Sequence, residues 1–414
     1  MRRAAVTLMA LGTTLALLGC GAPEAPATGP TPTPDPGTGA VARVVFVADS
    51  IAVTQGGSAQ ASAIAVDAAG QPVSGATVAY SVVGQGAGVA TVSTGGAVSG
   101  VKPGVTGIRA SVGSVAATAT LEVFGHPEGL LVGSEPLDGR PFGAAVSRHG
   151  VVYVTRLDAA AVARLDTTRR VVQSIAVGAT PTGIAFSPAG DLAYVTNQAS
   201  RTLGIVDVAA GAQVATIPLP ADPFVPFVSP DGAKLFVTSN TSRVFVADAQ
   251  SRALTGHVEL THAPNGFALH PDGARVYVSA SFGGTVHEID IATNAVRRTF
   301  EPGGMPQGLS VSRDGRELFV ANEAGWLDVY ALGSGERVAR VALAGGGFGL
   351  ATSPDEQHLY VSLPNAGTVQ VVNIEARRII HTLTVHGTPR RIAFTRHGGV
   401  AVIPNEAGYV SFVR

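Results

Sequence analysis

Charged, amide and aromatic side chains recur along the second half of the chain, at points where the sequence varies from one repeat to the next. These residue types make ion pairs, hydrogen bonds and stacking contacts with polar ligands or protein loops. Exposed loops are also polar without binding anything, so the pattern alone identifies no ligand. The candidates for a binding surface are Arg156, Asn197, Arg201, Asp222, Arg243, His262, Gln307, Glu323, Trp326, His386, Arg390 and Glu406.

Motifs for catalysis or metal binding are not found in the sequence. It contains no Gly-x-Ser-x-Gly nucleophile turn, phosphate-binding loop, His-Glu-x-x-His pair or calcium loop. His262 and His386 lack the additional ligands that a metal ion or haem would need. We therefore predict no catalytic residue, no metal and no cofactor.

A repeat positions the candidate side chains. Each repeat opens with a turn, such as Ser187-Pro-Ala-Gly190 or Ser229-Pro-Asp-Gly232, and continues into a strand-like run, such as Ala193-Tyr-Val-Thr196. The turns begin at positions 147, 187, 229, 270, 312, 353 and 395, so successive turns are 40 to 42 residues apart. Repeats of this length with four short strands are typical of β-propeller blades. The sequence thus predicts an all-β protein with a seven-bladed propeller.

The last repeat is one strand short. The chain ends at Arg414, after the third strand of that repeat, whereas 129–133 precedes the first repeat and has no blade of its own. We expect this N-terminal segment to pair outside 409–413 and close the ring, because closure removes exposed sheet edges.

The repeats resemble those of the YVTN-family β-propellers. The resemblance covers roughly 127–414, is most specific at Tyr194-Val-Thr-Asn197 and the Ser-Pro-Asp-Gly turns, and is looser at Ala401-Val-Ile403. It implies a surface or exported protein of bacteria or archaea. Members of that family are mostly binding or structural proteins, so the resemblance indicates location and shape more than chemistry.

The two faces of such a propeller differ in sequence variability. One face carries the links between blades and the loops between second and third strands, and the other carries the Ser-Pro-Asp-Gly turns. The turns are nearly uniform within this chain, as hairpin geometry requires. The loops of the other face vary, as recognition on a repeated scaffold requires. We call this the variable face and predict that it carries the binding residues.

The N-terminus has the pattern of an export signal. Arg2 and Arg3 precede a short apolar run, which is too short to span a membrane. Leu17-Leu-Gly-Cys20 resembles a bacterial lipobox, which implies a signal peptide over 1–19 and a lipid on Cys20; an ordinary export signal is the alternative. Residues 20–40 are rich in proline and predict an extended stalk. Gly21 favours anchorage at the outer membrane, facing the periplasm or the cell surface.

Residues 41–124 predict a separate β-sandwich. Strand-like runs such as 61–66 and 77–82 alternate with glycine-containing turns. The sequence of 67–75, together with those of 90–93 and 100–104, resembles group 2 bacterial Ig-like domains. That resemblance implies a spacer or adhesive module ahead of the propeller at 127–414.

Composition limits the classes of partner. The 28 basic and 29 acidic residues nearly cancel, so no nucleic-acid-binding surface is indicated. We predict a non-enzymatic envelope lipoprotein that binds a protein or glycan. The alternatives are a lactonase- or lyase-type propeller enzyme with a metal-dependent site at the channel mouth, and a purely architectural envelope protein.

Overall fold

The computed structural model describes residues 40–48, 50–83, 88–125, 129–166, 168–395 and 399–414. The predicted signal peptide, Cys20 and nearly all of the predicted stalk fall outside these residues. Within them, no helix has both the length and the apolar character that a membrane crossing requires.

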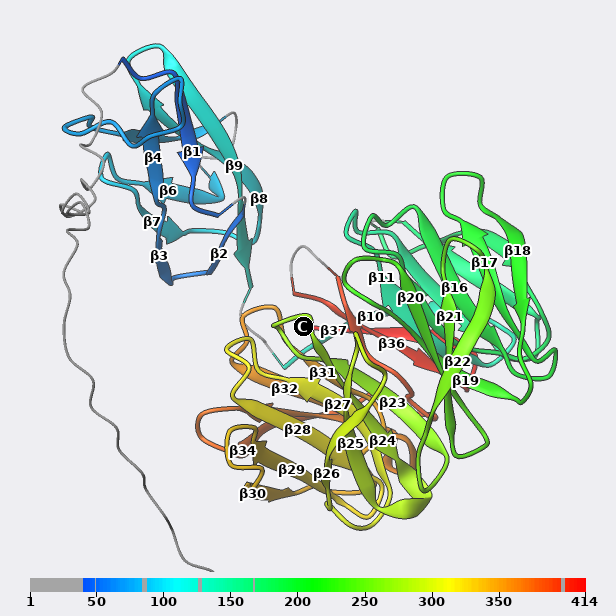
Figure 1. The fold of residues 1–414 in the computed structure, drawn as a ribbon. Helices are drawn as coiled ribbons and strands as arrows, with labels where there is room; N and C mark the ends of the chain where they lie inside the picture. The colour runs from blue at the N-terminus through cyan, green and yellow to red at the C-terminus, as the bar shows by residue number, and fades with distance from the viewer. Residues whose placement is uncertain (1–39, 49, 84–87, 126–128, 167, 396–398) are drawn as a thin grey trace, which may run out of the picture.

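The N-terminal strands form three sheets (Figure 1). β2, β9, β8 and β5 make one sheet, β3, β7 and β6 a second, and β1 pairs with β4. Side chains from both larger sheets share one hydrophobic core, in which Val98, Ile108 and Leu121 are fully buried. The strands are β1 (Arg43–Phe46), β2 (Ser50–Thr54), β3 (Ser58–Gln60), β4 (Ala63–Val66), β5 (Ala79–Val83), β6 (Ala90–Val92), β7 (Ala97–Gly100), β8 (Gly104–Val112) and β9 (Val115–Phe124).

The rest of the described chain forms seven four-stranded antiparallel sheets, which confirms the predicted seven-bladed propeller. We number the sheets in chain order. The first three comprise β11 (Pro141–Val146), β12 (Val152–Arg156), β13 (Ala161–Leu165) and β14 (Val171–Ala176); β15 (Pro181–Phe186), β16 (Leu192–Asn197), β17 (Thr202–Asp207) and β18 (Ala212–Pro218); and β19 (Pro223–Val228), β20 (Lys234–Ser239), β21 (Arg243–Asp248) and β22 (Ala253–Glu259).

The fourth to sixth sheets repeat this order, with a short 3-10 turn between the second and third strands of two of them. They comprise β23 (Pro264–Leu269), β24 (Arg275–Ala280), η2 (Ser281–Gly283), β25 (Thr285–Asp290) and β26 (Val296–Phe300); β27 (Pro306–Val311), β28 (Glu317–Asn322), β29 (Trp326–Ala331) and β30 (Arg337–Ala342); and β31 (Leu350–Thr352), β32 (His358–Leu363), η3 (Pro364–Ala366), β33 (Thr368–Asn373) and β34 (Arg378–Thr384).

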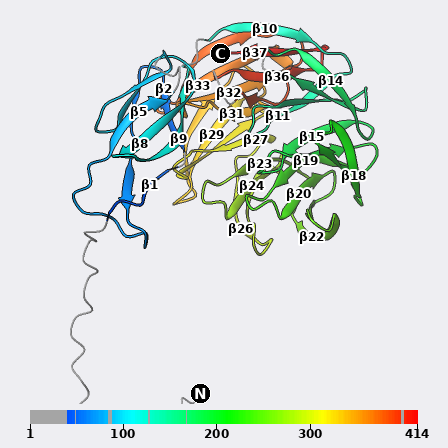
Figure 2. The same ribbon diagram turned by 90° about the horizontal axis from the view of Figure 1, so that it is seen from above.

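The seventh sheet joins the two ends of the propeller. It comprises β35 (Ala393–Phe394), β36 (Ala401–Asn405), β37 (Tyr409–Val413) and β10 (Leu131–Pro136). β10 pairs antiparallel with β37, and both views show the two strands side by side (Figure 1, Figure 2). The predicted closure by an N-terminal strand is confirmed, and the strand extends beyond the predicted segment to Pro136.

The repeating turns are held by their own serine and aspartate. In the third sheet the Ser229 hydroxyl donates to the Asp231 carboxylate and accepts the Lys234 backbone N–H at 2.8 Å. Asp231 also accepts the Ala233 backbone N–H at 3.0 Å. Gly232 follows with a φ of 75°, a left-handed conformation that favours glycine. These contacts explain why the turn is uniform along the chain.

The turn carboxylates make stability depend on pH. Hydrogen bonds from the Ser229 and Ser312 hydroxyls lower the pKa of Asp231 and Asp314. Because the folded pKa lies below the unfolded value of about 3.9, the stabilisation is complete above that value and is lost as pH falls through the folded pKa. We expect thermal stability to fall below about pH 4, and to fall less steeply in an Asp231→Asn, Asp314→Asn double variant. Melting curves between pH 2.5 and 7 test this, and equal slopes for the two proteins would contradict it.

A hydroxyl at the end of the Tyr-Val-Thr run joins neighbouring sheets. The Thr196 Oγ1 atom accepts the backbone N–H of Gly183 in its own first strand at 2.8 Å and donates to the Phe224 carbonyl of the next sheet at 2.7 Å. A Cβ at Gly183 would lie 2.5 Å from that same carbonyl, so the close approach of the two strands requires glycine there. We call this arrangement the hydroxyl bridge. It recurs at Thr155, Thr238, Ser279 and Ser362.

Removing one hydroxyl bridge should be costly. Thr196→Val preserves the volume but removes the hydroxyl partner of the Gly183 backbone N–H. The Phe224 carbonyl keeps only its hydrogen bond from the Thr182 hydroxyl, so we expect a loss of about 1–3 kcal/mol in the free energy of unfolding. Denaturant titration measures it. Thr216→Val, at an exposed position of β18, is the control and should change stability by less than about 0.5 kcal/mol. Equal effects of the two substitutions would contradict the role of the bridge.

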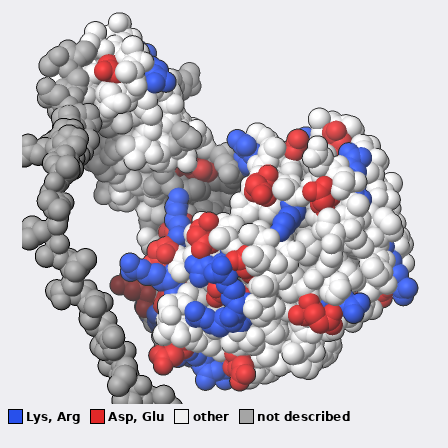
Figure 3. All heavy atoms as spheres, viewed as in Figure 1, with Lys and Arg blue, Asp and Glu red and all other residues white. Residues whose placement is uncertain are grey.

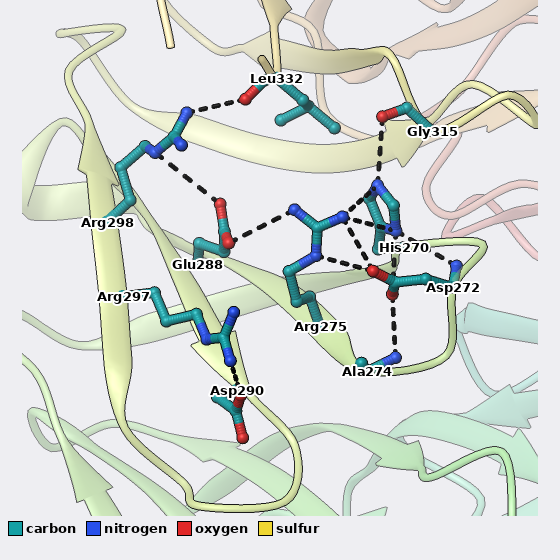
Figure 4. Close-up of polar contacts among 10 residues, drawn as sticks. All are labelled: His270, Asp272, Ala274, Arg275, Glu288, Asp290, Arg297, Arg298, Gly315 and Leu332. Carbon is teal, nitrogen blue, oxygen red and sulfur yellow. Dashed lines mark hydrogen bonds and ion pairs between the residues drawn. The ribbon is translucent and has the colours of Figure 1, made fainter. Parts of the chain in front are cut away.

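A buried ion network lies at the boundary between the fourth and fifth sheets (Figure 4). Glu288 of β25 has a side chain that is 5% exposed, with the Arg275 guanidinium at 3.6 Å and that of Arg298 at 4.0 Å. Arg298 also donates to the Leu332 carbonyl of the fifth sheet at 2.8 Å. His270 lies 3.1 Å from the Gly315 carbonyl of that sheet. The network therefore joins two blades through charged and polar side chains.

Candidate binding site at the centre of the propeller

The first strand of each sheet places one side chain at the same point near the ring centre. At the start of the first strand, or just before it in the sixth and seventh sheets, six sheets have proline or glycine, then a variable residue x, then glycine or valine. The seventh sheet has Pro389-Arg390-Arg391 at this point. In five of the seven sheets the carbonyl of the x residue accepts the hydroxyl bridge of the preceding sheet, which fixes its backbone. The seven x residues are Phe142, Thr182, Phe224, Asn265, Gln307, Phe348 and Arg390.

Contacts between sheets that are not neighbours show that some of these side chains meet at the centre. The Arg391 Nη2 atom of the seventh sheet donates to the Asn265 Oδ1 atom of the fourth at 2.8 Å. The rings of Phe142 and Phe348, from the first and sixth sheets, pack edge to face with centroids 5.9 Å apart. Sheets so far apart around a ring can touch only across its middle. We call Phe142, Asn265, Gln307, Phe348, Arg390 and Arg391 the central cluster.

Arg390 combines stacking with an ion pair. Its guanidinium lies over the rings of Phe348 and Phe142, at 4.9 and 5.4 Å from their centroids. It also donates to the carboxylate of Glu406. The Glu406 carboxylate also accepts a hydrogen bond from a second guanidinium, that of Arg140, at 2.6 Å. Desolvation raises the pKa of Glu406, but the hydrogen bonds from the two arginines outweigh it and the net pKa is lowered, so this carboxylate stays charged.

A second carboxylate lies beside the central cluster. The Gln307 amide donates to the Glu323 carboxylate at 2.9 Å. Desolvation raises the pKa of Glu323, and the charge of Arg390 together with the Gln307 hydrogen bond opposes that rise. Glu323 is nevertheless exposed at the rim, which places a carboxylate next to two amides and an arginine pair. Such a set of donors and acceptors suits a polar ligand.

The structure brings together four of the residues predicted from the sequence: Gln307, Glu323, Arg390 and Glu406. Two more form a separate pair, since the Arg201 guanidinium lies 2.7 Å from the Asp222 carboxylate. The Arg201 side chain of this pair is exposed and the Asp222 side chain is partly buried.

The remaining predicted residues lie apart from the central cluster. Arg156 is paired with Asp138 and donates to Ser174 at 2.9 Å, and Arg243 lies 2.8 Å from Glu259. The Trp326 ring is partly buried under the Arg340 guanidinium, 4.1 Å from the ring centroid. His262 and His386 are exposed and lie apart from the central cluster.

Asn197 is fully buried and has no exposed side chain to offer a ligand. Its amide donates to the Thr202 hydroxyl at 3.1 Å. The equivalent Asn322 and Asn405 accept backbone N–H groups of the preceding interblade link, from Met305 and Thr388, each at 2.8 Å. The asparagine that ends the second strand therefore holds nearby loops in place and does not contribute to a binding surface. The sequence pattern did not reveal this role.

Sequence reasoning missed Arg391, although a signal was present. The position holds glycine in five other sheets and valine in the third, so an arginine departs from the repeat. Asn265 lies in an interblade link of the variable face, but nothing in the sequence signalled its contact with Arg391, because the two residues are 126 positions apart.

Charge on the molecular surface is mixed. Figure 3 shows basic and acidic residues interspersed on the viewed face of the propeller. This agrees with the sequence, which has 28 basic and 29 acidic residues. Among the described residues, no group of three or more His, Cys, Asp and Glu side chains is placed to hold a metal ion.

Comparisons with known proteins agree on the fold. No protein-family model matches the chain. Antigen Lp49 of Leptospira interrogans is 25% identical over 186 residues, or 42% of this chain and 41% of that protein. The seven-bladed beta-propeller protein Rv1057 of Mycobacterium tuberculosis is 32% identical over 151 residues, or 34% of this chain and 38% of that protein. The chain thus spans about two fifths of the length of each of these curated relatives.

A solved structure supports the same conclusion. A chain of hydrazine synthase from Kuenenia stuttgartiensis superposes with a TM-score of 0.62 at 18% identity, covering 67% of this chain and 96% of that chain. At this identity the likeness concerns the fold alone. With its seven four-stranded sheets and its likeness to a named seven-bladed propeller, this chain is a β-propeller protein.

Proposed function

We propose that this protein is an exported lipoprotein of the bacterial cell envelope whose propeller binds a protein or glycan partner through the variable face. The observation that carries the binding proposal is the central cluster, where arginine, amide and phenylalanine side chains from five sheets meet beside two carboxylates. The opposite face carries uniform turns whose side chains are engaged in holding the turns themselves.

The remaining parts of the proposal concern location. Lipidation of Cys20 would hold the chain at the membrane, the proline-rich segment 20–40 would act as a stalk, and the β1–β9 unit would act as an Ig-like spacer for a YVTN-type propeller. The separate hydrophobic core of that unit supports its role as a distinct module. One relative is named an antigen, which supports a location accessible from outside the cell.

Binding is tested by comparing the two faces. Arg201, Arg243 and Arg390 are changed to glutamate together, and the matched control changes Arg148, Arg252 and Arg316, which are exposed beside the turns of the opposite face. We expect the first variant to lose at least tenfold of its binding to immobilised envelope proteins or glycans, while the control binds like the wild type. Equal recovery by all three proteins would contradict a role of the variable face.

Anchorage is tested separately. The mature protein should begin at Cys20, carry a lipid mass on that residue and enter the detergent phase on partition, whereas Cys20→Ser should stay in the aqueous phase. A mature chain that retains 1–19, or wild-type protein in the aqueous phase, would contradict lipid anchorage and leave the binding result unaffected.

A further inference from the structure

Arg391 occupies a position where five of the other sheets have glycine. In four sheets a Cβ at this point would lie 2.4 to 2.5 Å from the carbonyl of the next sheet, at Gly143, Gly183, Gly266 and Gly349. The seventh sheet also lacks the hydroxyl bridge, because Ile403 stands at that position, as Ala321 does in the fifth sheet. The Arg391 backbone N–H instead points to the Phe142 carbonyl at 3.4 Å. Arg391 therefore places a long side chain at a position where five other sheets have glycine.

The Arg391 side chain is a cation without a carboxylate partner. None of the ion pairs among the described residues includes Arg391, and the carboxylate nearest its neighbour, Glu406, is already shared by Arg390 and Arg140. Desolvation and the charge of Arg390 lower the pKa of Arg391 to about 10, with no acidic group opposing the effect. At neutral pH the guanidinium is still charged. It is thus an uncompensated charge in a partly buried place.

The hydrogen-bonding capacity of Arg391 is incompletely used. Its Nη2 atom donates to Asn265, and its guanidinium lies 5.6 Å from the centroid of the Phe348 ring. The Nε atom is buried and has no hydrogen-bond partner. A buried polar group without a partner is costly, and a buried charge is more so. Five other sheets have glycine at the position equivalent to Arg391, so the fold itself does not need an arginine there.

We propose that Arg391 forms the core of a binding site for a small oxyanion at the centre of the propeller, in which the free edge of the guanidinium receives a carboxylate or phosphate-type group. Guanidinium binds such groups through paired N–H donors. The Asn265 and Gln307 amides, which bond to each other, lie beside the guanidinium, and the Phe348 ring lies near it. The site lies deeper than the exposed arginines of the variable face, and it stands whether or not a protein or glycan partner binds there.

The test uses the mature wild-type chain with inorganic phosphate and acetate as separate probes, at an ionic strength kept constant with sodium chloride. We expect saturable binding of at least one probe by calorimetry, together with a melting temperature that rises with its concentration. The probe that binds distinguishes a phosphate-type from a carboxylate ligand. Absence of saturable binding of either probe to the wild type would overturn the proposal.

Three variants locate the site. Arg391→Gly, which restores the common residue of the repeat, should weaken probe binding at least tenfold, and Arg391→Gln provides a second test should the glycine variant fail to fold. Arg252→Gly, at an exposed turn position with a φ of 56°, removes a distant charge and should bind like the wild type. Without probe, Arg391→Gly should melt no lower than the wild type, because an uncompensated charge is removed. Undiminished binding by Arg391→Gly, or a lower melting temperature with no effect of either probe, would show that the arginine is structural.

Discussion

A chain that lacks β10 is expected to lose most of its propeller stability. Deleting 131–136 removes the outer strand of the seventh sheet, exposes the edge of β37 and leaves the first and last blades without their covalent connection across the ring. At about 1 kcal/mol for each net backbone hydrogen bond, loss of a strand of this length costs on the order of 5 kcal/mol. For a domain of this size that corresponds to a fall in melting temperature on the order of 8 °C. Calorimetry measures it.

The control for this deletion is a chain that begins at Gly129 and so lacks the β1–β9 unit but keeps β10. Its propeller transition should match that of the full chain, since the N-terminal unit has its own hydrophobic core. An unchanged melt on deletion of 131–136, or an equal fall in the control, would contradict closure by β10 as the source of stability.

Arg275→Met is expected to be the most damaging single substitution outside the ring closure. It would leave Glu288 buried with only Arg298, whose Nε atom is 4.0 Å away. Removing one partner of a buried ion pair typically costs about 3–5 kcal/mol, because the remaining charge is uncompensated. Denaturant titration would show this loss in the free energy of unfolding.

Removing the buried charge as well should restore stability. Other sheets carry apolar residues at the position of Glu288, including Ile205, Val246, Val329 and Val371. An Arg275→Met, Glu288→Ile double variant should therefore be at least about 2 kcal/mol more stable than Arg275→Met alone, because an apolar pair replaces the isolated carboxylate. If the loss in the double variant equals the sum of the losses in Arg275→Met and Glu288→Ile measured separately, Arg275 acts only through Asp272 and His270.

The architecture could be predicted from the sequence because it depends on local, repeated signals. The turn serines and glycines, the Tyr-Val-Thr runs and their regular spacing each report a short-range requirement of a four-stranded sheet. Ring closure followed from counting strands, because a seventh blade with three strands has only one unpaired segment available to complete it.

The central site could be predicted only in part. The arginines and amides of the variable face were visible as variable residues, but their partners were not, because Arg140 and Glu406 are 266 positions apart. Asn197 looked like a loop residue, yet its position at the end of β16 turns the side chain inward. Arg391 was conspicuous only as a departure from glycine, and its meaning required knowledge of how closely the first strands approach.

The most direct measurement of the proposed function is site-specific photo-crosslinking in cells that naturally express the protein. Phe282 in η2, whose side chain is 79% exposed, is replaced by a photoreactive phenylalanine, and Ala189 in a turn of the opposite face is replaced in a matched strain. Binding through the variable face predicts a discrete covalent adduct from position 282 that weakens when Arg390 is changed to glutamate, and none from position 189. Adducts of equal yield from both positions, or an adduct from position 189 alone, would contradict it.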